Sequence, residues 1–202
     1  SLIANWMRVG YCQGNFNSDN CAAGGYTLDY GPFGFCELFD PRFQPWTGGG
    51  EHFSFFNQPS AAEINFKTFC SSISPLLSES KQDLEKLEQI QNDFQELMNN
   101  QLKKMWSNKL GLEHYHEDHI NDFFNLMVTS KADFTILYRK LSDTPDNLDS
   151  LKDSFYLPIN DELITRWEVW LKNWQSIMKN EGDFKTKSTL MKSLNPVYTW
   201  RE

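Results

Sequence analysis

The chain has 202 residues, of which 40% are hydrophobic and 15% aromatic. This composition supports a folded protein with a real core and argues against a disordered chain. The formal net charge is −8, from 27 acidic and 19 basic residues, and no Lys/Arg cluster stands out. We therefore expect no nucleic-acid partner. Because no apolar run reaches the length that spans a bilayer, we expect no membrane partner either.

The four cysteines are Cys12, Cys21, Cys36 and Cys70. Their spacings of 9, 15 and 34 residues include no C-x-x-C pair, which argues against a zinc knuckle or a thioredoxin-like motif. We expect four mostly buried thiols. A regulatory disulfide stays open, and the sequence does not name its partners.

In chain order, residues 2–12 predict a short helix that Gly10 weakens at its end. Residues 14–60 contain many glycines, so we expect loops, with one short strand in the segment GYTLDY (25–30). After about residue 75 the pattern predicts one long amphipathic helix, or two in tandem, capped by Ser78 or Ser80 and ended by Gly111. Its expected apolar stripe consists of Leu84, Leu87, Ile90, Phe94, Leu97, Leu102, Met105 and Trp106.

Shorter helices are predicted near 117–128, 131–142, 160–180 and 186–194, with a turn-rich linker at 142–150. On the third of these helices, Trp167, Leu171 and Trp174 share one face and are expected in the core, whereas Trp170 is expected to be partly exposed. The fold class predicted is mostly α, with a loop-rich first third (1–75) and a helical remainder (76–202) in one partial domain.

Three oxygen-bearing side chains lie in a segment that is otherwise small, apolar or aromatic: Asp19, Asn20 and Asp29. Mg²⁺ takes one or two oxygen ligands from protein side chains and the rest from phosphates and water. Protein kinases pair an Asn with the Asp of a D-F-G turn for this purpose. Asp29-Tyr30-Gly31 has the form of that turn, and Asn20 precedes Asp29 by nine residues.

We therefore predict that a short hairpin brings Asn20 and Asp29 to one magnesium site, with Asp19 as the base for a hydroxyl nucleophile. The alternative is that Asp19 and Asn20 form only a turn and a helix cap. An ordinary kinase would carry H-R-D before the Asn, with its base five positions away. Here base and Asn are adjacent, so the local geometry must differ.

Two other motifs have simpler interpretations. HYHEDH contains His114, His116 and His119, for which metal ligation is conceivable but a solvated helix start is favoured. WTGGGEHF lacks the Gly-Lys-Ser/Thr ending of a phosphate loop, so we expect a flexible loop like a kinase activation segment.

The chain resembles the selenoprotein O (YdiU) family in six blocks that follow one another in the family's order. The blocks are GNFNSDN, TLDYGPFGF, FDPRF, FFNQPSAAE, ADFTILYRKLS and NPVYTWRE. They span most of the chain, and DYGPFGF together with FNQP is the most specific part. The resemblance implies a pseudokinase fold and a protein adenylyltransferase, which moves AMP from ATP onto Ser, Thr or Tyr hydroxyls of proteins and releases pyrophosphate.

By the same resemblance, Asp19 is the proton acceptor, and Asn20 and Asp29 hold Mg²⁺ or Mn²⁺ and the nucleotide. Gln13 stands where the family usually has His. The family's ATP-binding N-terminal lobe lies upstream of these blocks, so we expect this chain to be the helical C-lobe of a longer protein and to be inactive alone. The family implies a mitochondrial location in a eukaryote and a cytoplasmic one in a bacterium.

Two other functions stay open. One is a non-catalytic helical binding or regulatory module derived from a pseudokinase; the other is a protein kinase proper, because one fold hosts both chemistries. The intact set of Asp19, Asn20 and Asp29 favours the enzyme, since a dead descendant is free to lose any of them.

Overall fold

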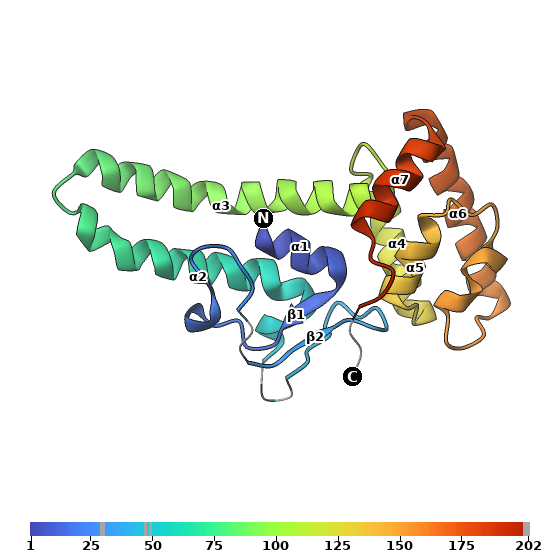
Figure 1. Cartoon of the computed structure of the whole chain (residues 1–202), viewed down its shortest axis with the longest axis horizontal. Coiled ribbons are helices and arrows are strands. Elements are labelled where there is room, and N and C mark those ends of the chain that lie inside the picture. The colour runs from blue at the N-terminus through green and yellow to red at the C-terminus, as the bar shows by residue number, and fades with distance from the viewer. Residues whose placement is uncertain (29–30, 47, 49, 200–202) are drawn as a thin grey trace. The chain divides into compact units, whose positions relative to one another are not determined.

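The computed structural model describes residues 1–28, 31–46, 48 and 50–199, and this part of the chain is mostly helical (Figure 1). The elements are α1 (Leu2–Val9), β1 (Tyr11–Gln13), β2 (Phe33–Phe35), α2 (Gln58–Ile73), α3 (Lys81–Lys109), α4 (Glu117–Ser130), α5 (Phe134–Leu141), α6 (Asp161–Glu181) and α7 (Phe184–Leu194). Short 3-10 turns lie between them. The prediction of a mostly α protein is confirmed, while the kinase-like arrangement of the helices stays a prediction.

The chain divides into two compact units. The first unit consists of Ser1–Met7, Tyr11–Gly34 and Pro41–Leu102, and the second of Arg8–Gly10, Phe35–Asp40 and Lys103–Glu202. Each unit has its own buried side chains and is described by itself.

Helix α1 ends earlier than the sequence pattern predicts. Gly10 has a φ of +77°, a left-handed conformation that ends the helix and that glycine adopts without strain. The next three residues form strand β1 instead of a last helical turn.

A two-stranded sheet of β1 and β2 closes the segment that carries the candidate site. Beside β1, the backbone N–H of Gly14 donates to the backbone oxygen of Pro32 at 2.8 Å. A Cβ at Gly14 would lie 2.9 Å from that oxygen, so only glycine permits this approach. The predicted strand at 25–30 is absent from its described residues, 25–28, because the pairing partners are the segments before and after this loop.

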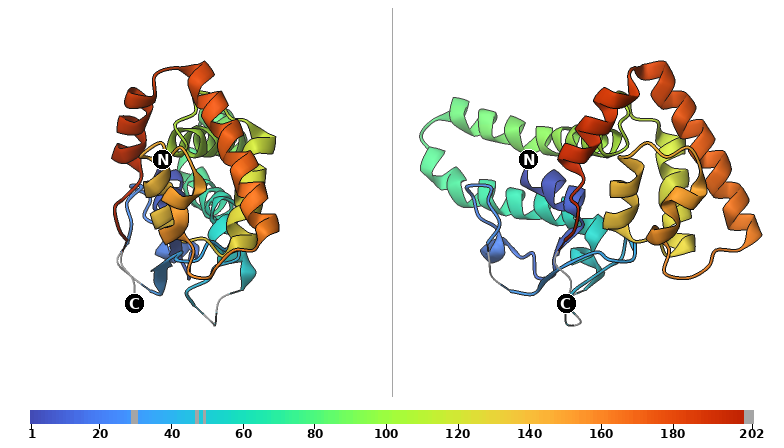
Figure 2. Two further views of the ribbon diagram at one scale, coloured as in Figure 1. Left: turned by 90° about the vertical axis from the view of Figure 1, so that its right-hand side faces the viewer. Right: turned by 45° about the vertical axis from the view of Figure 1, so that its right-hand side comes forward.

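Helices α2 and α3 form a hairpin in the first unit, joined through a 3-10 turn at Ser74–Leu77 (Figure 2). The rings of Phe66 on α2 and Phe94 on α3 stack with their centroids 4.9 Å apart. The Ser80 side chain accepts a hydrogen bond from the Asp83 backbone N–H at 3.3 Å, which confirms Ser80 as the cap of the long helix. Helix α2 was not predicted, because its apolar residues do not gather into one stripe.

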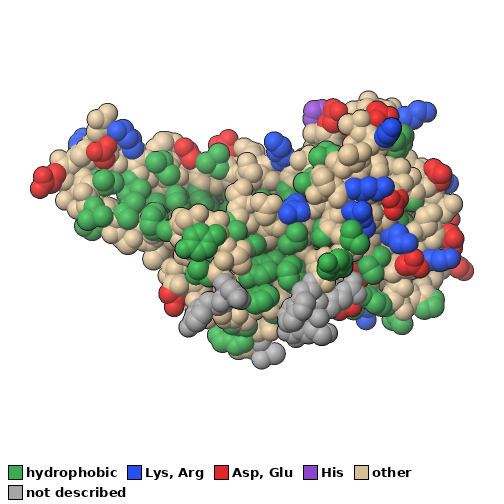
Figure 3. All heavy atoms as spheres, in the orientation of Figure 1, with side chains coloured by type: hydrophobic (Ala, Val, Ile, Leu, Met, Phe, Trp, Pro, Cys, Tyr) green, Lys and Arg blue, Asp and Glu red, His purple; other side chains and the backbone are tan. Residues whose placement is uncertain are grey.

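The apolar stripe predicted on α3 is only partly buried. Met105 and Trp106 are buried, but Ile90 and Leu97 are 55% and 61% exposed. Figure 3 shows hydrophobic side chains gathered over the region of α2 and α3. Helix α3 ends where it was expected to end: Gly111 has a φ of +68°, and the Leu112 backbone N–H donates to the Ser107 oxygen at 2.9 Å.

In the second unit, α4, α5 and α6 pack around aromatic side chains close to the positions predicted for these helices. Phe123 stacks on Trp170 with centroids 4.6 Å apart and meets Trp167 edge-on at 5.9 Å. The prediction that Trp170 is partly exposed is wrong, since only 3% of its surface is accessible. Its other face is covered by the ring of His119, 4.7 Å away, and its Nε1 donates to the His119 backbone oxygen at 3.0 Å.

A buried polar cluster of Lys109, Tyr138, Ser142 and Asn195 lies in this unit. The Lys109 Nζ donates to Asn195 Oδ1 at 2.9 Å and to the Arg8 backbone oxygen at 2.7 Å. Its ammonium also sits 3.7 Å from the centre of the Tyr138 ring. Burial lowers the pKa of Lys109 well below its usual value, and the nearby Arg8 guanidinium adds to this effect.

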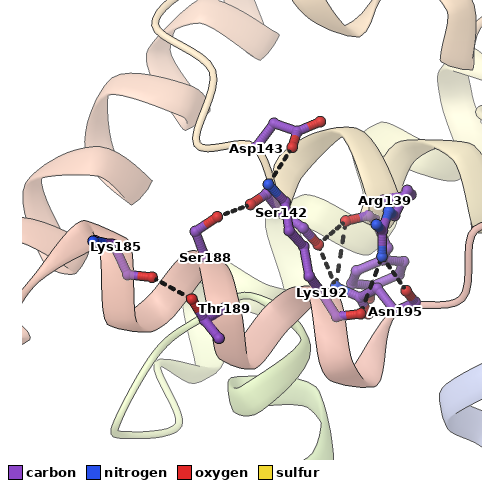
Figure 4. Close-up of polar contacts among 9 residues, drawn as sticks. Arg139, Ser142, Asp143, Lys185, Ser188, Thr189, Lys192 and Asn195 are labelled. Atoms are coloured by element: carbon purple, nitrogen blue, oxygen red, sulfur yellow. Dashed lines mark hydrogen bonds and ion pairs between the residues drawn. The ribbon is translucent and has the colours of Figure 1, made fainter.

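Asn195 completes the cluster from the end of α7. Its Nδ2 donates to the backbone oxygens of Lys109 and Tyr138 at 2.9 and 3.3 Å, and lies 3.0 Å from Ser142 Oγ. Beside it, the Arg139 guanidinium donates to the backbone oxygens of Lys192 and Asn195 (Figure 4). A single amide thus ties the ends of α3, α5 and α7 together.

The cysteines are free, and Cys12, Cys36 and Cys70 are buried while Cys21 is half-buried, as expected. Among the helices within the described residues, none is both long and apolar enough to cross a membrane. The turn-rich linker after α5 leads into a 3-10 segment at Leu148–Ser154.

We expect Asn195→Ala to lower the free energy of unfolding of the second unit by about 3 kcal/mol, because Lys109 Nζ loses one of its two acceptors and the buried oxygens of Lys109 and Tyr138 lose the Asn195 donor. Urea denaturation measures the change. The matched control is Asn173→Ala on the exposed face of α6, expected to change stability by less than about 0.5 kcal/mol. Equal stabilities for the two variants would contradict the role given to Asn195.

Candidate functional site

Asp19 and Asn20 lie together on a 3-10 turn, Ser18–Asn20, in the first unit. The Asn20 backbone N–H donates to the Asn17 oxygen at 3.0 Å, which forms the turn. The Asp19 side chain is exposed, and among the described residues it makes no hydrogen bond or ion pair. The turn of the simpler alternative is therefore present, while the Asp19 carboxylate caps no helix and is presented to solvent, where a hydroxyl group can reach it.

Asn20 is 5% exposed, and its amide is held in one orientation. Its Nδ2 donates to the Asn15 backbone oxygen at 2.9 Å, so its nitrogen has a structural role within the loop. This bond turns Oδ1 to the opposite side, where no donor from the described part of the chain reaches it. An amide oxygen that is fixed and not already hydrogen-bonded fits the oxygen-donor set that Mg²⁺ requires.

Asp29 lies outside the described residues, so its predicted approach to Asn20 stays a prediction. The residues that flank it are tied back to the first unit. Trp6 Nε1 donates to Thr27 Oγ1 at 2.8 Å. On the other side, Gly31 has a φ of +83°, and Gln13 Nε2 lies 3.9 Å from where a Cβ of residue 31 would stand.

Gln13, which stands where the resembling family usually has His, is a buried structural residue here. It is 1% exposed, and its Oε1 accepts a hydrogen bond from the Tyr11 hydroxyl. Its side chain thus lies beside strand β1 and close to Gly31.

Gln58, at the start of α2, anchors strand β1 through its side-chain amide. Its Oε1 accepts from the Gln13 backbone N–H at 2.9 Å, and its Nε2 donates to the backbone oxygens of Tyr11 and Phe55 at 2.9 and 3.2 Å. It is fully buried. The amide replaces backbone partners that a two-stranded sheet leaves missing.

Asn65, two helical turns after Gln58, reaches the loop itself. Its Nδ2 donates to the Phe16 backbone oxygen at 2.9 Å. It also opposes the rise that burial causes in the pKa of the Cys21 thiol. Neither Gln58 nor Asn65 was singled out from the sequence. The signal that marks them is a pair of amide side chains seven positions apart, on one face of a helix.

The other candidate motifs contribute no metal centre. No group of three or more His, Cys, Asp or Glu side chains among the described residues could hold a metal ion. In HYHEDH, His116 pairs with Glu181 at 2.8 Å, while His119 stacks on Trp170, and burial lowers the pKa of His119 to about 4. In WTGGGEHF, residues 47 and 49 lie outside the described residues, and Glu51–Phe53 form a 3-10 turn.

Comparison with known proteins finds a family model and a curated relative to which the chain is similar. The model of a family described as protein adenylyltransferase SelO matches residues 1–202. The chain is also similar to the protein nucleotidyltransferase YdiU of Flavobacterium johnsoniae, with 29% identity over 214 positions that cover 99% of this chain and 40% of that protein. The chain thus spans about two fifths of the length of the curated relative that it matches.

We expect Gln58→Leu to destabilise the first unit by about 3 kcal/mol, because Gln13 N–H and the oxygens of Tyr11 and Phe55 lose their partner inside the protein. Urea denaturation, followed by Trp6 fluorescence, measures the loss. The control is Gln95→Leu on the exposed surface of α3, expected to be nearly neutral. A Gln58→Leu variant as stable as this control would show that these three bonds are not needed.

Proposed function

The chain belongs to the SelO family of protein adenylyltransferases, and from this premise we propose that it is the catalytic part of an enzyme that transfers AMP from ATP to hydroxyl groups of proteins. The observation that carries the proposal is the pairing of an exposed Asp19 carboxylate with a buried, oriented Asn20 amide on one short turn. The helical binding module has no need of such a pair.

The proposed reaction begins at Asp19. Its carboxylate accepts the proton of a Ser, Thr or Tyr hydroxyl, and the hydroxyl oxygen attacks the α-phosphorus of ATP. A new phosphorus–oxygen bond forms, the bond to the bridging oxygen breaks, and pyrophosphate leaves with the electron pair. The Asn20 oxygen and the Asp29 carboxylate would hold Mg²⁺ or Mn²⁺. When bound, this ion would offset charge on the triphosphate.

We also propose that the chain adopts the larger, helical lobe of a kinase-like fold and needs an ATP-binding lobe from the same polypeptide. Transfer from ATP depends on holding the α-phosphorus in line with the hydroxyl, so most of the rate comes from positioning and electrostatics. Asn20 and Asp29 alone give Mg²⁺ too little to replace its waters.

The transferred group distinguishes the proposed function from a kinase. Mass spectrometry of a protein substrate incubated with Mg-ATP should find added AMP with a longer polypeptide that includes the upstream lobe, and no label with the 202-residue chain. Added phosphate would instead identify a kinase. No label from either polypeptide would favour the binding module, and turnover by the short chain would contradict the need for a second lobe.

In the longer polypeptide, Asp29→Ala should lower AMP transfer at least about 100-fold, since it removes the only charged protein ligand proposed for the metal. The assay is incorporation of labelled AMP at saturating Mg²⁺. The matched control, Asp146→Ala, removes an exposed carboxylate of the second unit and should retain full activity. Near-normal transfer by Asp29→Ala would rule out its role at the metal.

A further inference from the structure

We infer that Asn65 is a positioning residue that holds the turn of Asp19 and Asn20 in its reactive geometry; the inference rests on the proposed function. Asn65 lies on α2, far from the turn in sequence, and is 7% exposed. Its hydrogen bond goes to the Phe16 backbone and not to the side chain of Asp19 or Asn20, so it would act through the backbone that carries them.

The two contacts of Asn65 bracket the turn. Phe16, whose backbone oxygen accepts from Asn65 Nδ2 at 2.9 Å, comes just before it. Cys21 comes directly after Asn20, and its side chain lines the same cavity as that of Asn65. Asn65 also opposes the rise that burial causes in the pKa of the Cys21 thiol. The Asn65 amide thus holds the residue before the turn by a hydrogen bond and lies near the residue after it.

The fixed point for this clamp is α2 itself. Gln58, on the same face of the helix, is bonded to strand β1 on the near side of the loop. The helix therefore holds the loop at its strand through Gln58 and at its turn through Asn65. Because these bonds are buried, water competes weakly for the same groups, and each bond constrains the loop more than an exposed one would.

Within the described residues, the other hydrogen bonds at the turn are local. They run from Asn20 N–H to the Asn17 oxygen at 3.0 Å, from Cys21 N–H to the Ser18 oxygen at 3.4 Å and from Asn20 Nδ2 to the Asn15 oxygen at 2.9 Å. The side chains of Phe16, Ser18, Cys21 and Asn65 also line a cavity of about 410 Å³, so the turn borders open space on that side. Without Asn65, we expect Asp19 and Asn20 to sample several positions, which costs catalysis more than it costs folding.

The sharpest variant is Asn65→Asp, which keeps the size of the side chain but has no N–H to donate when ionised. If Asn65 only fills space, this isosteric variant is nearly normal. If it clamps the turn, Asn65→Asp loses the hydrogen bond to Phe16 and sets a carboxylate against the Phe16 oxygen. Asn65→Gln keeps both donors, and the adjoining cavity leaves room for its extra methylene, so it should restore part of the activity.

The kinetic arm uses the longer polypeptide with its upstream lobe. We expect Asn65→Asp to lower kcat for AMP transfer about 100-fold and to raise the Mg²⁺ concentration for half-maximal rate, with KM for the protein substrate changed less than about 3-fold. Asn65→Gln should recover at least about 10-fold of the lost kcat. The control is Thr68→Ala, an exposed α2 residue whose hydroxyl bonds only to its own helix.

The second arm does not require an active enzyme. It therefore distinguishes a wrong inference about Asn65 from a wrong proposed function. Hydrogen exchange at the Asn20 and Cys21 amides should be at least about 10-fold faster in Asn65→Asp, and unchanged in the interior of α2. If the unsubstituted enzyme transfers no AMP, the proposed function falls, and this exchange alone decides whether the clamp exists. Unchanged exchange in Asn65→Asp overturns the inference. Global unfolding of Asn65→Gln does the same. So does an Asn65→Asp variant that is less stable throughout the first unit but has a normal kcat.

Discussion

The bond between the Gln58 side chain and strand β1 is the constraint on which the first unit depends. A two-stranded sheet leaves half of its backbone groups without strand partners, and buried groups of this kind cost free energy unless something else pairs with them. Gln58 supplies that pairing with one amide, which both accepts from Gln13 and donates to Tyr11. The sheet in turn closes the loop that carries Asp19 and Asn20, so the placement of the candidate site follows from a helix residue outside it.

The second unit uses the same physical device at another place. Asn195 pairs with the ends of three helices and with the Lys109 ammonium, in an interior otherwise packed with aromatic rings. A buried amide is well suited to such a junction, because it donates and accepts at once and carries no charge to desolvate. Both amides lie in blocks that carry the family resemblance, FFNQPSAAE and NPVYTWRE, which gives those blocks a structural reason to exist as well as a chemical one.

The candidate site is held by local contacts within its own turn and by contacts from a helix distant in sequence. The 3-10 turn sets Asp19 and Asn20 side by side through local backbone bonds. Helix α2 then fixes the turn from a distance through Asn65. This arrangement leaves the Asp19 carboxylate accessible while its backbone is held, which is the combination that the proposed base for a protein hydroxyl would need.

The sequence by itself determined the mostly α class, the long helix with its Ser80 cap and Gly111 end, the four helices after it and the free thiols, because periodicity, capping and spacing are local signals. It also led to the prediction that Asp19 and Asn20 belong to a metal–nucleotide site, because the chemistry of such a site restricts residue type, and this stays a prediction. Only the tertiary structure decided the strand pairing, the existence of α2, the burial of Trp170 and the roles of Gln58 and Asn65. Which strands pair, and where a buried amide side chain finds its partners, depends on which backbone groups come close together in space. A local sequence pattern does not contain that information. The strand predicted at 25–30 is absent from its described residues, 25–28, for this reason: they have strand propensity, but the observed pairing is between β1 and β2.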